Sequence, residues 1–382
     1  MPFWQREVLR DGVSMTFNQT YELDLPTTGL LGSLTLYIRS AQNAAALTST
    51  RLWRLFEYIS KIEVIGDGAE VIKSFDGPQA LASAYYAQGV EPLGKWGNYN
   101  GVTHRQIIPI NFGRFLEDEL YGLDLSRFNQ VTLKITTTAT STQFTTGITL
   151  SVIAHWLREG AGAFAGYFRE EEWKTWAPSA NAAEYSELPT RWPIRRILLR
   201  ARPAVATSPS LQNAHSINAQ MATIDFTARS GQTRMYNGSL EVLGWLFTSE
   251  FGREVVTRGE VMRAADDHFD CGIGYVTSIV AAASQVDDPG GVYPGTIIRA
   301  DTQLSSQLVW DVDGTSPVEF VARGYAYLHT LPLFFATKPD LADLLEVEAM
   351  KQMSVDITPG SGTFTGASVN AESGIVLSRL VR

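Results

Sequence analysis

Two stretches of the chain decide its fold: IEVIGDGAEVIKSFDG at residues 62–77 and IDFTARSGQTRMYNG at residues 224–238. Each stretch has an apolar run, a polar turn that contains glycine, and a second run that ends in glycine, which is the pattern of a β-hairpin. Ile224 lies 162 residues after Ile62, and Gly238 lies 161 residues after Gly77. The spacing barely drifts, so the sequence predicts one β-rich unit followed by a second of the same layout.

The segments that follow the hairpins also match. Helix-forming residues follow each hairpin, over 78–88 in the first unit and over 240–251 in the second. Each unit then contains a long loop, at 89–104 and at 266–291, and we expect both loops at the same end of the molecule. The closing strands predicted for the two units are 131–135 with 148–155, and 308–312 with 318–329.

Composition limits the classes of function. At 382 residues the chain is long for one core and suits two domains. Its charged fraction of 19% is lower than the usual quarter, as expected for sheets and broad subunit contacts. The net charge of −9 argues against sequence-specific nucleic-acid binding, which needs clustered Lys and Arg.

Cysteine content and the N-terminus indicate the compartment. Cys271 is the only cysteine, so an intrachain disulfide is impossible. Residues 1–6 lack the apolar segment of a signal peptide, and no apolar run reaches the roughly 20 residues of a membrane span. We therefore expect synthesis in a reducing cytoplasm.

The chain divides into five segments by pattern. Residues 1–15, with faint helical spacing, are interpreted as an N-terminal arm. A first sandwich is predicted at 16–157 and a second at 193–335, because strands recur about every ten residues. Residues 158–192, rich in Trp, Pro and Gly, are interpreted as a packed linker. Residues 336–382 are predicted to form a helix, with apolar spacing over 342–353, and a Gly/Ser/Thr-rich tail.

Two sheets closed by Greek-key connections form a jelly roll. The duplicated hairpin and helix at 62–87 and 224–247, the paired closing strands, and the run 107–115 leading to Val131 resemble the double jelly-roll major capsid proteins. This family occurs in tailless icosahedral viruses and phages and includes the adenovirus hexon. The resemblance implies an all-β fold of two tandem antiparallel jelly-roll sandwiches with short flanking helices.

The resemblance also implies a function. A chain of this family is a structural protein of the virion, without enzymatic activity or a cofactor. It forms pseudo-hexameric homotrimers that tile an icosahedral shell around the genome. The implied partners are neighbouring trimers and penton or minor capsid proteins, and the family also allows an internal lipid membrane beneath the shell.

Candidate chemical sites are few. The five histidines are scattered, and neither a Gly-x-Ser-x-Gly elbow nor a phosphate-binding loop is present. The metal-ligand candidates are Asp266, Asp267, His268 and Asp270, but their spacing fits neither a calcium loop nor a four-ligand zinc site. A solvated loop is the competing interpretation for this cluster. The carboxylate run at 170–172 is likewise interpreted as a solvated face.

The N-terminus offers a candidate contact surface. Phe3, Trp4, Arg6 and Arg10 combine aromatic and basic side chains, which suits contact with lipid headgroups or the genome. A short arm that contacts another subunit is the equal alternative.

A carbohydrate-binding spike or adhesin, or a glycan-active β-sandwich protein, is the alternative function. Such a protein would expose several tryptophans on one face. Trp53, Trp156, Trp245 and Trp310 instead fall within periodic segments, as residues of a core or an interface do.

Overall fold

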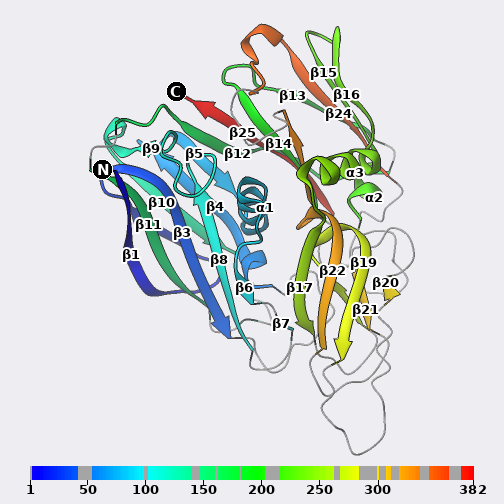
Figure 1. The fold of residues 1–382 in the computed structure, drawn as a ribbon, viewed down its shortest axis with the longest axis horizontal. Coiled ribbons are helices and arrows are strands. Elements are labelled where there is room, and N and C mark those ends of the chain that lie inside the picture. The colour runs from blue at the N-terminus through cyan, green and yellow to red at the C-terminus, as the bar shows by residue number, and fades with distance from the viewer. Residues whose placement is uncertain are drawn as a thin grey trace, which may run out of the picture.

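The fold consists mainly of strands arranged in two units (Figure 1). The computed structural model describes residues 2–41, 54–95, 97–98, 102–138, 144, 147–159, 162–180, 182–202, 216–261, 267–283, 299–300, 307–310, 318–335, 344–360 and 371–382. Among the described residues, no helix has the length and apolar character needed to cross a membrane.

In its described residues, the first unit contains eight principal strands and the buried helix α1. Its elements are β1 (Phe3–Met15), β2 (Thr20–Asp24), β3 (Leu30–Ala41), η1 (Leu55–Tyr58), β4 (Ile59–Gly66), β5 (Glu70–Phe75), α1 (Gly77–Gln88), β6 (Gly94–Lys95), β7 (Gly97–Asn98), β8 (Thr103–Asn111), β9 (Leu123–Asp124), η2 (Leu125–Arg127), β10 (Val131–Thr137) and β11 (Ile148–Arg158).

The second unit repeats this plan. Its elements are β12 (Tyr167–Trp176), β13 (Glu184–Leu188), β14 (Ile194–Arg202), α2 (Ile217–Gln220), β15 (Thr223–Ala228), β16 (Thr233–Ser239), α3 (Leu240–Phe251), β23 (Thr330–Phe334), η5 (Glu348–Met350), β24 (Met353–Thr358) and β25 (Glu372–Val381).

Strand order identifies each unit as a jelly roll. One face of the first unit has the order β1-β11-β3-β8 and the other has β2-β10-β4-β5. The second unit has β12-β25-β14-β23 and β13-β24-β15-β16. With the principal strands of each unit counted from its own start, both units show the orders 1-8-3-6 and 2-7-4-5. The predicted fold class is therefore confirmed, and Ile62 and Ile224 lie on equivalent strands, β4 and β15.

The two helices that follow the hairpins are capped alike. Asp76 caps α1 by accepting a hydrogen bond from the backbone N–H of Gln79, and Ser239 caps α3 in the same way. Each helix has twelve residues and ends at a glycine in the left-handed conformation, Gly89 or Gly252. Gly77 and Gly238 both lie where the hairpin leads into the helix, but not at equivalent positions. Gly77 follows the N-cap of α1, whereas Gly238 precedes the N-cap of α3 and pairs with Ile224 as Phe75 pairs with Ile62.

The second unit carries a long insertion between α3 and β23. The insertion forms a sheet of order β19-β22-β17-β7 and a smaller one of order β18-β21-β20. Its strands are β17 (Val255–Val261), β18 (Asp267–Asp270), β19 (Ile273–Ala283), β20 (Arg299–Ala300), β21 (Gln307–Trp310) and β22 (Val318–Tyr327). Strand β7 of the first unit pairs in parallel with β17, so the described part of the 89–104 segment contacts the insertion. That contact is with β17, not with residues 266–291, so the shared end of the two loops stays a prediction.

The insertion corrects two predictions. The described residues of the predicted closing strands, 308–310 and 318–329, do not close the second jelly roll, because they contribute β21 and β22 to the insertion. Residues 311–312 lie outside the described residues. The strands equivalent to β10 and β11 are β24 and β25. The described part of the predicted loop 266–291 also contains strands, β18 and β19.

The termini and the linker need correction too. Residues 3–15 form a strand paired along its length with β11, not a helical segment, so backbone hydrogen bonding replaces the missing apolar face. The predicted linker contains β12 and β13, the first two strands of the second jelly roll. The helical spacing over 342–353 reflects Leu345 and Val347, which pack into the second core beside the short turn η5. Residues 361–370 of the predicted tail lie outside the described residues, and the chain then enters the central strand β25.

One sheet belongs to both units. Strand β5 pairs in parallel with β12, so the sheet runs β2-β10-β4-β5-β12-β25-β14-β23. In β14, Leu198 packs into the first core while its neighbours Ile197 and Leu199 pack into the second. The second jelly roll therefore presents the back of its sheet to the first unit.

Candidate functional site at the seam between the units

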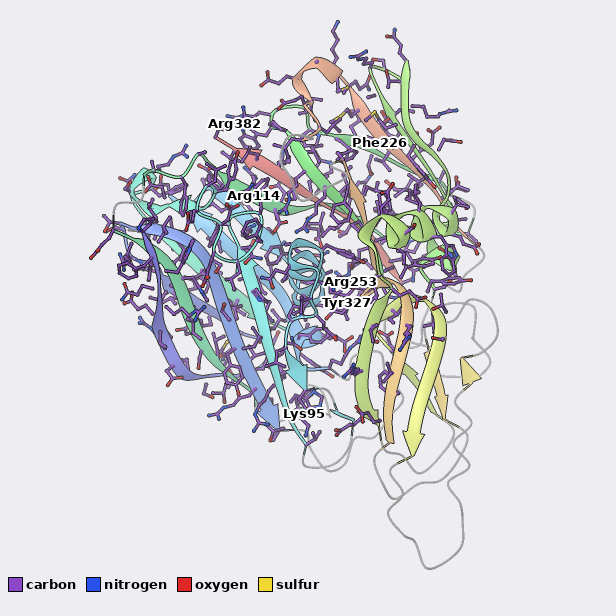
Figure 2. All side chains as sticks on the ribbon, in the orientation of Figure 1. Lys95, Arg114, Phe226, Arg253, Tyr327 and Arg382 are labelled. Carbon is purple, nitrogen blue, oxygen red and sulfur yellow. The ribbon has the colours of Figure 1, made fainter. Side chains whose placement is uncertain are left out.

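The seam is the contact of α1, β5 and η1 with β12, β14, β23 and the insertion. Aromatic side chains fill part of it around Tyr327 (Figure 2). The rings of Tyr85 and Tyr327 stack with centroids 4.6 Å apart. The hydroxyl of Tyr86 donates to the carbonyl oxygen of Thr330 at 2.7 Å and accepts from the backbone N–H of Tyr327 at 3.0 Å.

Buried charges form the centre of the seam. Glu170 on β12 accepts hydrogen bonds from Lys73 of β5 at 2.9 Å and from Arg196 of β14 at 2.7 Å. Ser83 of α1 donates to the same carboxylate at 2.9 Å and accepts from Arg196 at 2.6 Å. Four elements from the two units thus converge on one carboxylate, which we call the Glu170 cluster.

Burial and charge oppose each other in this cluster. Burial raises the pKa of Glu170, but the charges of Lys73 and Arg196 outweigh it and hold the pKa far below its ordinary value. Burial lowers the pKa of Lys73, against the attraction of Glu170. The carboxylate is therefore ionised at neutral pH, and removing it would leave two cations buried without their counter-charge.

A second cluster joins η1 to the insertion. The Arg54 guanidinium donates to Glu57 at 2.7 Å and to Asp270 at 2.8 Å. Asp270 also accepts from the backbone N–H of Gly272 at 2.9 Å, and its Oδ1 lies 2.8 Å from Nε2 of His329. We call these residues the Asp270 cluster.

The two carboxyl groups of the Asp270 cluster differ. Burial raises the pKa of Asp270, but His329 and Arg54 together lower it well below its usual value. Burial dominates at Glu57 and raises its pKa in spite of the attraction of Arg54. Arg54 thus shares its charge between a carboxylate of its own unit and one of the insertion.

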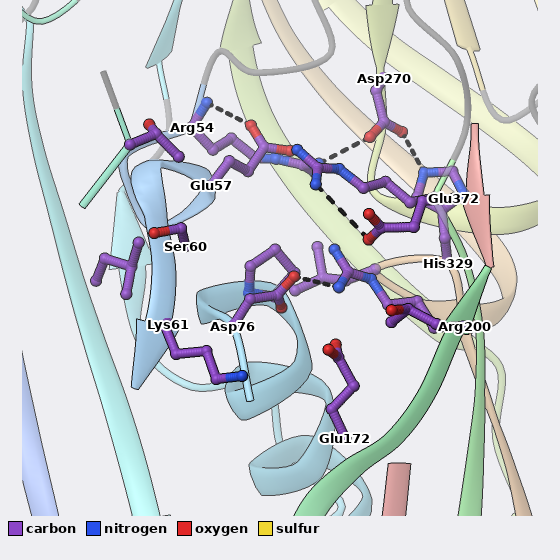
Figure 3. A pocket seen from close by; sticks show the side chains of 16 residues that line it. Arg54, Glu57, Ser60, Lys61, Asp76, Glu172, Arg200, Asp270, His329 and Glu372 are labelled. Carbon is purple, nitrogen blue, oxygen red and sulfur yellow. Dashed lines mark hydrogen bonds and ion pairs between the residues drawn. The ribbon is translucent and has the colours of Figure 1, made fainter. Parts of the chain in front are cut away.

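A cavity of ≈ 200 Å³ lies beside the Asp270 cluster (Figure 3). Asp76, the N-cap of α1, pairs there with Arg200 of β14. Glu172 accepts a hydrogen bond from the side chain of Gln79 at 2.7 Å. The lining contains both acidic and basic side chains, and the pairs Arg54–Asp270 and Arg200–Asp76 cross the seam.

The chemistry of the seam is that of adhesion between units. His329 and Asp270 resemble the base and orienting group of a catalytic triad, but nucleophilic catalysis also needs an activated nucleophile within reach. Burial raises the pKa of the Cys271 thiol, which keeps this neighbouring group protonated. The arrangement can hold two units rigidly in register.

The proposed metal ligands are placed differently. Asp270 is committed to Arg54 and His329, while Asp267 and His268 lie in β18 and Asp266 lies outside the described residues. Within the described part of the chain, no group of three or more His, Cys, Asp or Glu side chains could hold a metal ion.

The N-terminal candidates all lie on β1. Trp4 packs over Gly32, where an added Cβ would lie 2.4 Å from the indole ring. Arg6 pairs with Glu117 at 2.9 Å, and Phe3 and Arg10 are exposed.

The carboxylates at 170–172 were misinterpreted as a solvated face. Glu170 lies in the seam, and Glu171 pairs with Arg169 and Arg379. The sequence does contain a signal for this: Arg196 and Arg200 flank the apolar run 197–199 of β14 and, four residues apart, fall on the same side of the strand. Charges at strand spacing inside an apolar strand indicate buried ion pairs.

No family model matches the chain. No curated protein matches it by sequence either.

Solved structures do match. The major capsid protein of Sulfolobus Turreted Icosahedral Virus matches with a TM-score of 0.59 and 10% identity, over 98% of this chain and 96% of that chain. A PBCV-1 virus capsid structure gives 0.56 and 11% identity, over 100% and 94%. The major capsid protein from bacteriophage PM2 gives 0.52 and 9% identity, over 100% and 98%. The chain therefore has the double jelly-roll fold of these viral capsid proteins.

Proposed function

We propose that the chain is the major capsid protein of an icosahedral virion and assembles as a homotrimer. The observation that carries the proposal is the complete duplication of the jelly roll over nearly the whole chain, with the two copies fused through one shared sheet. Three such chains supply six similar units, which suits a pseudo-hexameric tile. The fold match to capsid proteins over the full length supports the same conclusion.

The seam explains how one chain provides two rigid units. A hinge between the jelly rolls would let the tile change shape and would weaken its lattice contacts. The Glu170 and Asp270 clusters and the shared sheet instead fix the units against each other. In this proposal the seam has a structural role, without enzymatic activity or a cofactor.

Other partners follow from the geometry of a shell. Pseudo-hexameric tiles cannot fill fivefold vertices, which need a penton protein, and minor capsid proteins would join tiles to one another. The exposed Phe3 and Arg10 on the edge strand β1 suit contact with a neighbouring subunit. The protein would act in the virion after synthesis in the host cytoplasm, and an internal membrane is compatible with this arrangement.

The glycan-binding alternative lacks an aromatic platform among the described residues. Trp156 is buried. The two tryptophans described as exposed, Trp173 and Trp245, lie on different elements, β12 and α3. The indole N–H of Trp173 already donates to the carbonyl oxygen of Glu187.

Size-exclusion chromatography with light scattering tests the proposal. We expect a stable species of three times the 42.1 kDa chain mass. Electron microscopy of concentrated samples should then show hexagonal tiles or shells. A chain that stays monomeric at every concentration, or a monomer that binds glycans, would contradict the proposal.

A further inference from the structure

Helices α1 and α3 are equivalent in the two units but lie in different surroundings. Because both have twelve residues between matching caps, they can be aligned without gaps. Counted from the N-cap, Gln79, Ser83 and Tyr86 of α1 correspond to Val242, Leu246 and Ser249 of α3. Ala82 likewise corresponds to Trp245. These positions form one face of each helix, by the i, i+3, i+4, i+7 rule.

In α1 this face contacts the second jelly roll. Gln79 bonds to Glu172, Ser83 bonds to Glu170 and Arg196, and Tyr86 bonds to Thr330. All four residues of the face are buried.

In α3 the same face is open to solvent and largely apolar. Val242 is 63% exposed, Trp245 46% and Leu246 45%. Such a stripe on a helix is the usual mark of a surface that another protein covers.

The surface that receives α1 also has an open counterpart. Helix α1 of the first unit lies against the back of the sheet β12-β25-β14-β23 of the second unit. The equivalent surface of the first unit is the back of β1-β11-β3-β8. Strand pairing places two neighbouring rows of residues across this surface. One row consists of Val8, Ile153, Thr35 and Pro109, and the other of Ser151, Tyr37 and Ile107.

The two rows are mostly apolar and accessible, and the exposed Arg39 and Arg105 lie in the next row on the same side. Val8 is 58% exposed, and Ile153, Tyr37, Ile107 and Pro109 are partly exposed. The opposite side of the same strands, with Leu36, Val152 and Ile108, is the core. The chain thus carries both halves of a second seam, one on each unit.

The edges of the sheets show the same correspondence between a contact within the chain and an open surface. Within the chain, the edge of β5 joins the edge of β12 in parallel. Their equivalents are β16 and β1, and among the described residues each is the last strand of its sheet. The open strand edges and the open helix face therefore lie at corresponding places.

We propose that the face Val242, Trp245 and Leu246 of α3 docks on the back of the sheet β1-β11-β3-β8 of a second copy of this chain. The contact repeats between chains the packing that α1 makes within one chain, and it rests on the proposed capsid function. It is a head-to-tail contact, in which one chain offers α3 and the next offers the sheet, so repetition can close a ring. The replacement of Gln79 and Ser83 by Val242 and Leu246 suits a contact between separate molecules, because apolar anchors bind without the desolvation of charges.

Two single variants and their mixture test the proposal. Leu246→Asp removes the helix half of the contact, and Val8→Asp removes the sheet half. Tyr185→Asp, at a residue 46% exposed on β13 and away from both proposed surfaces, is the matched control. Full-length chains would be measured by light scattering, with circular dichroism melts to show that each variant is folded.

Wild type and Tyr185→Asp should have the mass of three chains, and each of the other variants alone should have the mass of one. An equimolar mixture of Leu246→Asp and Val8→Asp should have the mass of two chains, because one intact contact then remains and no ring can close. Folded variants that stay trimeric, or a mixture that stays at the mass of one chain, would overturn this inference and leave the capsid proposal standing. A monomeric wild type would overturn both.

Discussion

The face of α1 that is covered within the chain and the equivalent face of α3 show how one fold element can be adapted to two environments. The α1 face is polar and meets a buried charge network, whereas the α3 face is apolar and open. A network of buried charges tolerates little error in position, because each ion must meet its partner to offset its desolvation. A contact formed once, within a folding chain, provides that precision. A contact between separate chains is better supplied by apolar area.

The largest effect is expected from Glu170→Ala. The substitution leaves Lys73 and Arg196 buried without their carboxylate. We expect a loss of about 3–5 kcal/mol in the free energy of unfolding, the range for breaking one side of a buried ion pair. Urea denaturation followed by circular dichroism would measure it.

Glu22→Gln is the control for this variant, because Glu22 and Lys134 form an exposed pair at 2.8 Å. It should leave the denaturation midpoint unchanged. Equal effects of the two substitutions would mean that the seam does not depend on its buried charges.

A pH-dependent effect of intermediate size is expected at Glu91, which follows α1 at the seam. Burial raises the pKa of Glu91 to about 7, against a hydrogen bond from Tyr327 and the charges of Arg54 and Arg258. The folded chain then binds more protons than the unfolded chain between the ordinary glutamate pKa of 4.5 and about 7. The free energy of unfolding should therefore fall as pH rises through this window. Each unit of pKa difference corresponds to about 1.36 kcal/mol, so the fall is up to about 3 kcal/mol.

The glutamine of Glu91→Gln cannot ionise, so this variant should have a shallower stability profile between pH 4.5 and 7, to which Glu57 still contributes. Chemical denaturation at several pH values would show this. Glu254→Gln, at a neighbouring partly exposed carboxylate, should keep the wild-type slope. A wild-type profile that is already flat over this window would contradict the placement of Glu91.

The smallest effects are expected at the two helix caps. Ser239→Ala removes one hydrogen bond to the N–H of Val242 and should cost about 1 kcal/mol. Asp76→Ala removes the equivalent bond to Gln79 and also the partner of Arg200, so it should cost more, about 2 kcal/mol. Thermal melts of the two variants would compare them. A larger loss for Ser239→Ala would show that α3, not α1, is the more tightly integrated helix.

Sequence patterns predicted the repeated hairpin and helix because those elements are encoded locally. The turn at 66–68, the cap at Asp76 and the stop at Gly89 are all readable from residue types. The closing strands of the second unit were assigned wrongly, because β21 and β22 show the same apolar character as β10 and β11. Sheet partners are set by distant pairing, and the insertion breaks the constant offset of the repeat.

The seam was harder to predict for a similar reason. Glu170 is followed by two further carboxylates, a pattern usually typical of solvent exposure. Its partners Lys73 and Arg196 lie 97 and 26 residues away in the sequence. Only the shared sheet, which no local pattern encodes, brings them together.

Electron cryo-microscopy of the purified assembled protein tests most directly whether the second seam closes between chains. We predict threefold particles with six jelly rolls, in which Val242, Trp245 and Leu246 of each chain are covered by the β1-β11-β3-β8 sheet of the next. Particles in which this face of α3 remains open to solvent, or in which chains pair through the same surface on both partners, would contradict that prediction.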